Sequence, residues 1–239
     1  MSAKLTDEGQ KGTKMQEYTI ENLYDLNETI AADIFKGVTY PWEVLPKIKE
    51  FILELGKTLP EDKFEKVGDD IWIAKSVKFL SRQNNYIAGP CIIDEDAEIR
   101  PGAFIRGSVI VGKGAVVGNS TELKNVILFN KVQVPHYNYV GDSILGFKSH
   151  MGAGSITSNV KSDKKLVVVK NGKDDQVETG LKKMGAMLGD NVEVGCGSIL
   201  NPGTVIGRES NIYPLSSVRG CVPAKHIFKD KDNIVPKTE

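Results

Sequence analysis

The sequence has few cysteines and no long apolar run. Its three cysteines (Cys91, Cys196 and Cys221) are scattered and form no CxxC pair, which argues against a disulfide framework and against a zinc site of the usual ligand spacing. No apolar stretch approaches the ~20 residues that cross a bilayer. The first residues, MSAKLTDEGQKGTK, lack the apolar centre of a secretory signal. We therefore expect a cytoplasmic protein with no membrane partner.

The sequence also has no excess of positive or negative charge. Lys and Arg together number 31, as do Asp and Glu, so the formal net charge is zero. This balance provides no electrostatic basis for binding nucleic acid or an anionic membrane. Aromatic residues are only 7% of the 239 residues, whereas 24 are glycine. This combination favours a turn-rich β protein over a helical bundle.

What the chain does have is an aliphatic residue at every sixth position. The two series are Ile93, Ile99, Ile105, Val111, Val117, Leu123 and, later, Leu188, Val194, Leu200, Ile206, Ile212, Val218. A period of six fits neither a helix nor a single strand. It suits a solenoid of short strands and tight corners, in which one aliphatic side chain of each hexad points inward. We predict a mostly β protein, a parallel β-helix solenoid with an N-terminal helical segment.

The regions flanking these repeats have a different character. The spacing of apolar residues predicts helices over about 21–35 and 42–55, the second with Val44, Ile48 and Ile52 on one face. We expect these helices to pack beside the first turns and to cover the N-terminal end of the core. The predicted divisions are a mobile tail (1–16), a helical capping segment (17–75), the solenoid (76–228, with a polar excursion at 170–187) and a C-terminal tail (229–239).

Between the two series the repeat slips by one residue twice, from Leu123 to Leu128 and from Val140 to Leu145. A solenoid tolerates such slips where a loop or bulge is extruded, and irregularities of this kind often lie at functional sites. The segment around them holds two of the three histidines, His136 and a second at position 150. We therefore look for the chemistry there.

Two cations in this region are spaced by one full turn of the predicted solenoid. Arg106 and Lys124 are 18 residues apart, and three hexads make about 18 residues per turn. They should therefore lie one above the other, about 5 Å apart, where they repel each other unless an anion lies between them. The alternative is that both are solvated surface groups.

The repeats resemble the left-handed β-helix of the hexapeptide acyltransferases. The stretches PHYNYVGDS (135–143) and GAGSITSN (152–159), with two lysines following, resemble the catalytic region of a more specific family. This is the C-terminal acetyltransferase domain of bifunctional sugar-1-phosphate nucleotidyltransferases. The stretch ETGLKKMGAMLGDNVEVGCGSILNPGTVIG (178–207) resembles the archaeal-type branch. The resemblance covers residues ~90–225.

The resemblance implies roles for individual residues. His136 corresponds to the general base, and the backbone N–H of Ala153 to the group that meets the acetyl carbonyl. The residues expected to hold the sugar phosphate are Lys124, Tyr139, Asn159 and Lys165, with His150 where the family has an asparagine, and with either Arg106 or Arg100 as the site arginine. We prefer Arg106 because of its distance to Lys124. The predicted CoA contacts are Ala153, Cys196 and Pro214.

On this basis we expect a CoA-dependent N-acyltransferase that uses acetyl-CoA as cosubstrate and acts on an amino sugar phosphate or a similar small amine. The chemistry needs no metal and no covalent intermediate. A homotrimer is implied, with sites between neighbouring copies, because His136 and Lys124 are two hexads apart and fall on different faces of one prism. No GxGTR-like phosphate loop is present, so we expect no pyrophosphorylase chemistry.

Two alternatives remain open. The first is a non-catalytic protein that binds a sugar nucleotide or acts as a scaffold, for which His150 and the N-terminal helices are the motivation. The second is a γ-class carbonic anhydrase, which shares the predicted fold but needs three zinc histidines, two of them close in sequence. The histidines here (His136, His150 and His226) include no close pair, which argues against a carbonic anhydrase.

Overall fold

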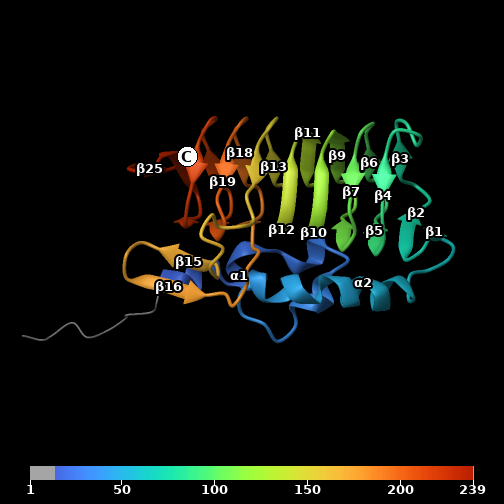
Figure 1. Cartoon of the computed structure of the whole chain (residues 1–239), viewed down its shortest axis with the longest axis horizontal. Helices are drawn as coiled ribbons and strands as arrows, with labels where there is room; N and C mark the ends of the chain where they lie inside the picture. Colours follow the sequence, from blue (N-terminus) through green and yellow to red (C-terminus); the bar gives the residue numbers. More distant parts are fainter. Residues whose placement is uncertain (1–13, 239) are drawn as a thin grey trace, which may run out of the picture.

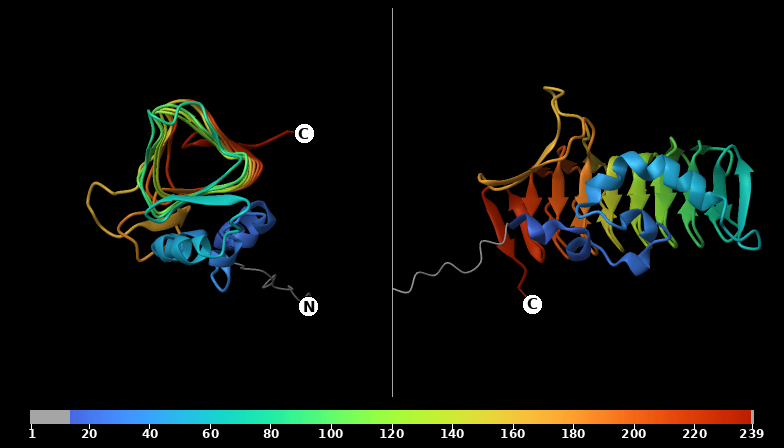
Figure 2. Two further views of the ribbon diagram at one scale, coloured as in Figure 1. Left: turned by 90° about the vertical axis from the view of Figure 1, so that its right-hand side faces the viewer. Right: turned by 90° about the horizontal axis from the view of Figure 1, so that it is seen from below.

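The computed structural model describes residues 14–238. A parallel β-solenoid of triangular cross-section runs the length of the molecule, and the N-terminal helices lie along one of its sides (Figures 1 and 2). The chain is mostly β, with the predicted left-handed parallel β-helix and N-terminal helical segment. Over the described range, no helix has both the length and the apolar character needed to cross a membrane.

Each turn of the solenoid contributes one short strand to each of three faces. We call them the covered, second and third faces, in the order in which the chain visits them. The covered face comprises β2 (Ile71–Ala74), β5 (Cys91–Ile93), β8 (Val109–Val111), the ends of β10 (Glu122–Leu128) and β12 (Tyr139–Leu145), β17 (Ala186–Leu188), β20 (Thr204–Ile206) and β23 (Cys221–Val222), with β1 (Phe64–Gly68) antiparallel to β2.

The second face comprises β3 (Lys78–Phe79), β6 (Glu98–Ile99), β9 (Val116–Asn119), β11 (Gln133–His136), β13 (His150–Met151), β18 (Glu193–Val194), β21 (Asn211–Ile212), β24 (His226–Asp230) and β25 (Asn233–Pro236). The third comprises β4 (Tyr86–Ile87), β7 (Phe104–Ile105), the beginnings of β10 and β12, β14 (Ile156–Thr157), β19 (Ile199–Leu200) and β22 (Ser217–Val218).

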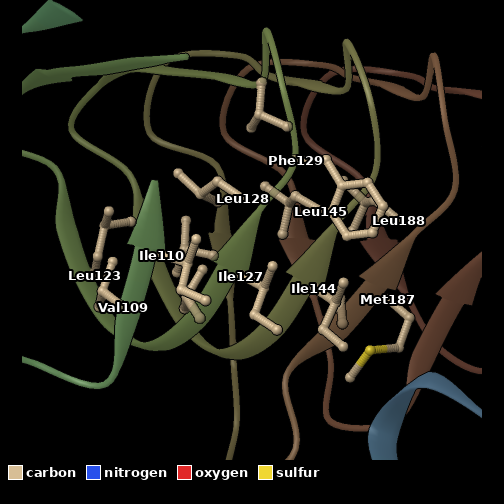
Figure 3. Close-up of a cluster of buried hydrophobic side chains, with 14 of the residues drawn as sticks. Val109, Ile110, Leu123, Ile127, Leu128, Phe129, Ile144, Leu145, Met187 and Leu188 are labelled. Carbon is tan, nitrogen blue, oxygen red and sulfur yellow. The ribbon is translucent and has the colours of Figure 1, made fainter. Parts of the chain in front are cut away.

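The aliphatic residues of the six-residue repeat fill the inside of the prism. All twelve are buried, ten of them with no exposed surface. Parallel pairing places them one above another, as for Val111, Leu128, Leu145 and Leu188 on the covered face. Figure 3 shows Leu128, Leu145 and Leu188 in one such row. The core predicted from the repeat is confirmed.

The covered face is apolar on its outer side as well. Successive side chains of a strand point to opposite sides, so the residues beside the inner row face outward. Ile110, Ile127, Ile144 and Met187 are aligned across neighbouring strands and form a second row in Figure 3. None of the four has exposed surface, because the N-terminal segment lies over them.

The N-terminal segment is less helical than predicted. The expected helix over 21–35 consists of a short α1 (Ile20–Leu23) and two 3-10 turns, η2 (Leu26–Glu28) and η3 (Ala32–Phe35). The expected second helix is η4 (Pro41–Lys47) followed by α2 (Ile48–Gly56). A continuous first helix is prevented because its backbone bonds to the solenoid instead: Asp25 N donates to Asp190 Oδ2 (2.7 Å), and Asp190 N donates to Leu23 O (3.0 Å).

The second helix packs beside early turns of the solenoid, as expected, but the segment does not cover the end of the core. It packs along the covered face, with α2 against β5, β8 and β10 and η4 against β12, rather than over the N-terminal end of the core. Figure 2 shows the helices beside one flat side of the triangle. At the N-terminal end of the solenoid, the antiparallel β1 borders β2 on the covered face. The prediction of an end cap is therefore wrong, although the helices do cover apolar surface.

Several predicted boundaries differ from the observed ones. Residues 14–16 belong to η1 (Lys14–Tyr18) rather than to a tail, and the rest of that predicted tail lies outside the described residues. The solenoid begins with β2, before residue 76. The excursion runs from the end of β14 to the start of β17 and contains the hairpin β15 (Val168–Asn171) and β16 (Asp175–Glu178). Much of the predicted C-terminal tail forms the β24–β25 hairpin.

Candidate functional site

One edge of the prism, between the second and third faces, carries the predicted base and the predicted CoA contacts. The column consists of His136, Ala153, Cys196 and Pro214, on four successive turns, and all four residues are exposed. Backbone hydrogen bonds connect the turns: Gly154 N donates to His136 O (3.0 Å) and Gly197 N donates to Ala153 O (2.8 Å). We call this column the histidine edge.

The backbone N–H of Ala153 is a free donor on this edge. Over residues 14–238 it has no hydrogen-bond acceptor, and the residue is exposed. An unpaired backbone N–H that faces solvent one turn below an imidazole can donate to an oxyanion. The position of Ala153 therefore suits the role implied by the resemblance.

Asn138 holds the two turns of the histidine edge together. Its side chain is almost fully buried, and Oδ1 accepts from His136 N (3.1 Å). On the next turn, Nδ2 donates to Gly152 O (2.9 Å) and to Ser155 O (3.1 Å). One buried amide thus fixes the backbone of His136 and the turn that contains Ala153. Sequence reasoning did not single out Asn138, although it lies within the motif PHYNYVGDS.

A glycine on the preceding turn allows this edge to form. A Cβ atom on Gly118 would overlap the carbonyl group of Pro135. Pro135 directly precedes His136 in β11. Only glycine therefore permits the close approach that places the backbone of His136 on the edge.

The cations expected to hold phosphate lie on a different edge, between the third and covered faces. Arg106 N donates to Leu123 O (2.9 Å), which places Arg106 and Lys124 on adjacent turns. Arg100 lies at the opposite end of the third face and pairs with Glu98 (2.6 Å). The structure therefore places Arg106, and not Arg100, on the edge of Lys124. We call this the lysine edge.

Each of the two cations has a carboxylate of its own. Arg106 Nη1 lies 2.6 Å from Glu122 Oε1, and both side chains are substantially exposed. Lys124 Nζ lies 3.3 Å from Asp142 Oδ2, and the Asp142 side chain is only 6% exposed. The charge repulsion expected between the stacked cations is therefore relieved by two protein carboxylates.

Asp142 gathers most of the predicted phosphate ligands around it. Its Oδ2 accepts from Asn159 Nδ2 (2.5 Å), and its Oδ1 accepts from Asn125 Nδ2 (2.9 Å). Asn159 Nδ2 also donates to the hydroxyl oxygen of Tyr139 (3.1 Å). Lys124, Tyr139 and Asn159 are thus brought together, as the resemblance implies, around a carboxylate that sequence reasoning missed. The signal for it was the slip in the repeat, since Asn125 and Asp142 lie at the two slips.

The environment of Tyr139 keeps its hydroxyl protonated. Partial burial raises the pKa of Tyr139 above its ordinary value, and the negative charges of Asp142 and Glu122 raise it further. The ring lies against Gly141, where a Cβ atom would meet the phenol oxygen. At neutral pH the hydroxyl can therefore donate a hydrogen bond to an anionic ligand.

Two predicted substrate residues lie away from this cluster. His150 is on the second face, where its Nδ1 lies 2.8 Å from Glu193 Oε2. Lys165 is exposed on the excursion, and its side chain forms no hydrogen bond or ion pair with residues 14–238. Among residues 14–238, neither side chain forms a hydrogen bond or ion pair with Lys124, Asp142 or Asn159.

The three histidines do not converge. His136 lies on the histidine edge, whereas His150 and His226 lie in separate strands of the second face, β13 and β24. Within the part of the chain that is described, no group of three or more His, Cys, Asp or Glu side chains could hold a metal ion.

Comparison with known proteins agrees with this geometry. The family model described as "GMPPB C-terminal domain" matches residues 87–235, which include every strand from β5 to β24. The chain belongs to this family. The match covers both edges described above and leaves the N-terminal segment outside it.

Relatives of known name are similar over the same region. The bifunctional protein GlmU of Methanococcus aeolicus is 32% identical over 185 residues, covering 70% of the chain and 44% of the relative. The bifunctional sugar-1-phosphate nucleotidylyltransferase/acetyltransferase of Sulfurisphaera tokodaii is 34% identical over 164 residues, covering 61% and 41%. The predicted relationship to these bifunctional proteins is confirmed. The chain spans less than half the length of each.

Among solved structures, the polySia-specific acetyltransferase NeuO is similar with a TM-score of 0.42 and 13% identity, covering 71% of this chain and 88% of that one. A GDP-perosamine N-acetyltransferase from Caulobacter crescentus, solved with CoA and GDP-perosamine, has a TM-score of 0.31 and 14% identity, covering 69% and 58%.

Proposed function

We propose that the chain is a CoA-dependent N-acyltransferase that transfers an acetyl group to the amine of an amino sugar phosphate or a similar small amine. The observation that carries the proposal is the histidine edge. There, the imidazole of His136 and the free N–H of Ala153 lie on adjacent turns, ~4.8 Å apart along the solenoid. Acyl transfer to nitrogen needs a proton acceptor and an oxyanion donor of this kind.

The proposed reaction is a direct transfer. The amine nitrogen attacks the thioester carbonyl carbon, and His136 accepts the proton that the nitrogen loses. The Ala153 N–H stabilises the negative charge that develops on the carbonyl oxygen. The C–S bond then breaks, and the CoA sulfur takes the proton from the imidazolium. Cys91 and Cys221 do not act as nucleophiles, because burial raises the pKa of each thiol to about 12 and keeps it protonated.

The histidine edge offers an extended path for CoA. From His136 to Pro214 the column descends three turns, or ~14 Å. Beyond Pro214 a groove of about 470 Å³ is lined by Arg219, Lys229 and Lys231. These cations suit the phosphate groups of CoA, while the thioester lies near Ala153.

The sugar phosphate would bind at the lysine edge, with Arg106, Lys124 and Tyr139 around the phosphate. Because the third face separates this edge from His136, we propose a homotrimer in which the histidine edge of one copy meets the lysine edge of the next. The third face supports this arrangement, because it exposes apolar side chains between the two edges (Tyr86, Phe104 and Ile199). Large exposed apolar groups commonly mark protein interfaces.

The second candidate is a non-catalytic protein that binds a sugar nucleotide, and one observation bears on the strength of phosphate binding in either case. Glu122 and Asp142 already neutralise both cations of the lysine edge, which weakens their pull on a phosphate. Thermal-shift measurements discriminate between the two functions. Stabilisation by acetyl-CoA, followed by thiol release when glucosamine 1-phosphate is added, supports the enzyme. Stabilisation by a nucleotide sugar alone, without thiol release, supports the non-catalytic protein that binds a sugar nucleotide.

A further inference from the structure

Asp142 is a buried carboxylate with an unusually complete set of donors. Its side chain is 6% exposed. Asn125 and Asn159 each donate one hydrogen bond to it, at 2.9 and 2.5 Å, and Lys124 Nζ lies 3.3–3.4 Å from its two oxygens. Burying a carboxylate is costly unless it is paired and hydrogen-bonded, and here Lys124 and Asn125 of β10, together with Asn159 just after β14, meet that need.

The backbone is shaped to allow this arrangement. Asn125 and Asp142 both adopt left-handed conformations, with φ of 53° and 48°. Each lies at a corner that is one residue shorter than the regular repeat, in the long strands β10 and β12, which pair with each other. The shortened corners place the two side chains on adjacent turns, within hydrogen-bond distance. Non-glycine residues in this conformation are uncommon, and asparagine and aspartate tolerate it best.

The two carboxylates of the lysine edge behave differently. Glu122 is half-buried, and its ion pair with the exposed Arg106 is of the surface kind, which stabilises little because water screens it. A bound phosphate can displace it. Asp142 is buried and hydrogen-bonded, so it stays in place when a ligand binds. The ammonium group of Lys124 has three donors and remains 28% exposed, so it can reach a phosphate while still paired with Asp142.

We infer that Asp142 is a positioning residue, which holds Lys124, Asn125 and Asn159 as one hydrogen-bonded unit so that the lysine edge meets a sugar phosphate with its donors already arranged. The inference rests on the proposed function for the identity of the ligand, but not for the arrangement itself. Asp142 itself does not contact the substrate. It should affect the binding of the sugar phosphate and not the binding of acetyl-CoA.

The main test compares Asp142→Asn with a matched control, Asp190→Asn. Asp190 is equally buried, pairs with Arg208 (3.3 Å), and lies on the remaining edge of the prism, where it holds the N-terminal segment. For Asp142→Asn we expect the KM for glucosamine 1-phosphate to rise about tenfold or more, since small misplacements of binding groups have large effects. The KM for acetyl-CoA should stay within about twofold. Asp190→Asn should leave both KM values within about twofold.

A second variant keeps the test decisive if Asp142→Asn folds poorly. Asn125→Gly tolerates the left-handed corner and removes one donor to Asp142, so it should raise the same KM by a smaller factor. Equal changes in both KM values, or no change in either variant, would overturn the inference.

A measurement without turnover separates this inference from the proposed function. The side-chain amide resonances of Asn125 and Asn159 in ¹H–¹⁵N spectra should both shift in Asp142→Asn and stay unchanged in Asp190→Asn. Unchanged resonances in Asp142→Asn would refute the positioning role, whatever the activity. If the resonances shift but the unmodified protein releases no thiol with any amino sugar phosphate, the arrangement stands and the proposed function fails.

Discussion

His136 and Lys124 lie at opposite edges of the third face of the prism, although β10 and β11 follow each other in the chain. A small ligand that touched both residues in one copy would have to extend across that face. Two copies packed side by side can instead bring the two edges together. This relationship is the structural reason for expecting an oligomer.

We predict that the protein is a homotrimer at micromolar concentration. Light scattering should give the mass of three chains. Replacing Phe104, an exposed residue of β7 on the third face, by Glu should dissociate the trimer and abolish acyl transfer together. A monomeric unmodified protein with full activity would contradict the shared site.

His136→Ala should slow acyl transfer by ~10²–10⁴-fold, the usual contribution of a positioned general base. The imidazole is exposed, so the free energy of unfolding should change by no more than ~0.5 kcal/mol. The rate is measured by thiol release and the stability by urea unfolding. His150→Asn is the control, and it should retain activity, because His150 pairs with Glu193 on the second face. Full activity of His136→Ala would exclude the proposed base.

Asn138→Ala should lower kcat more than it raises either KM. The buried amide fixes the backbone of His136 and of the turn that carries Ala153, so its loss misplaces both groups that act on the transition state. We expect a loss of about tenfold or more in kcat. Steady-state kinetics with each substrate varied in turn would show this. A change confined to KM would contradict the role proposed for Asn138.

The six-residue period predicted the inner core because every turn must bury one aliphatic residue per face. The covered face was missed, although it left a signal: Ile92, Ile110, Ile127 and Ile144 each precede an inner aliphatic residue, about one turn apart. An apolar outer position that recurs once per turn marks a face that something covers. The broken first helix could not be predicted, because its cause is a hydrogen bond to Asp190, 165 residues from Asp25.

The site could be predicted in part, where it depends on the regular length of a turn. Arg106 and Lys124 stack because their spacing matches one turn, which sequence alone reveals. Asp142 neutralises Lys124 only because two corners are one residue short, and the slips indicated an irregularity without indicating which side chains would meet there. The separation of His136 from Lys124 followed from counting hexads, and the structure agrees with it.

Removing residues 1–58 should cause aggregation. Ile110, Ile127 and Ile144 would lose the cover that the N-terminal segment provides, which exposes a continuous apolar sheet surface. A milder test is Ile52→Ala in α2, whose side chain is fully buried; it should lower the free energy of unfolding by about 2–5 kcal/mol. Glu50→Ala, on the exposed side of α2, should change it by less than about 0.5 kcal/mol. A soluble truncated protein with unchanged melting would refute this role.

The stability of the fold should depend on the protonation of Asp94. Burial raises the pKa of Asp94 above its ordinary value of 3.8, against the opposing hydrogen bond from the backbone of Glu95. Because the folded state binds this proton more tightly than the unfolded state, the associated stabilisation is complete below pH 3.8 and is lost as the pH rises through the folded pKa. Asp94→Asn lacks this titration. Its free energy of unfolding relative to the unmodified protein should therefore increase from acidic to neutral pH, and urea unfolding that gave the opposite slope would contradict the assignment.

The most direct test of the proposed function is release of the CoA thiol from acetyl-CoA across a panel of amino sugar phosphates. We expect thiol release that depends on the amine, with one molecule of N-acetylated product formed for each thiol and with His136→Ala at least about a hundredfold slower. Absence of thiol release with every amine on the panel, in a preparation whose melting temperature acetyl-CoA does not change, would contradict the proposal.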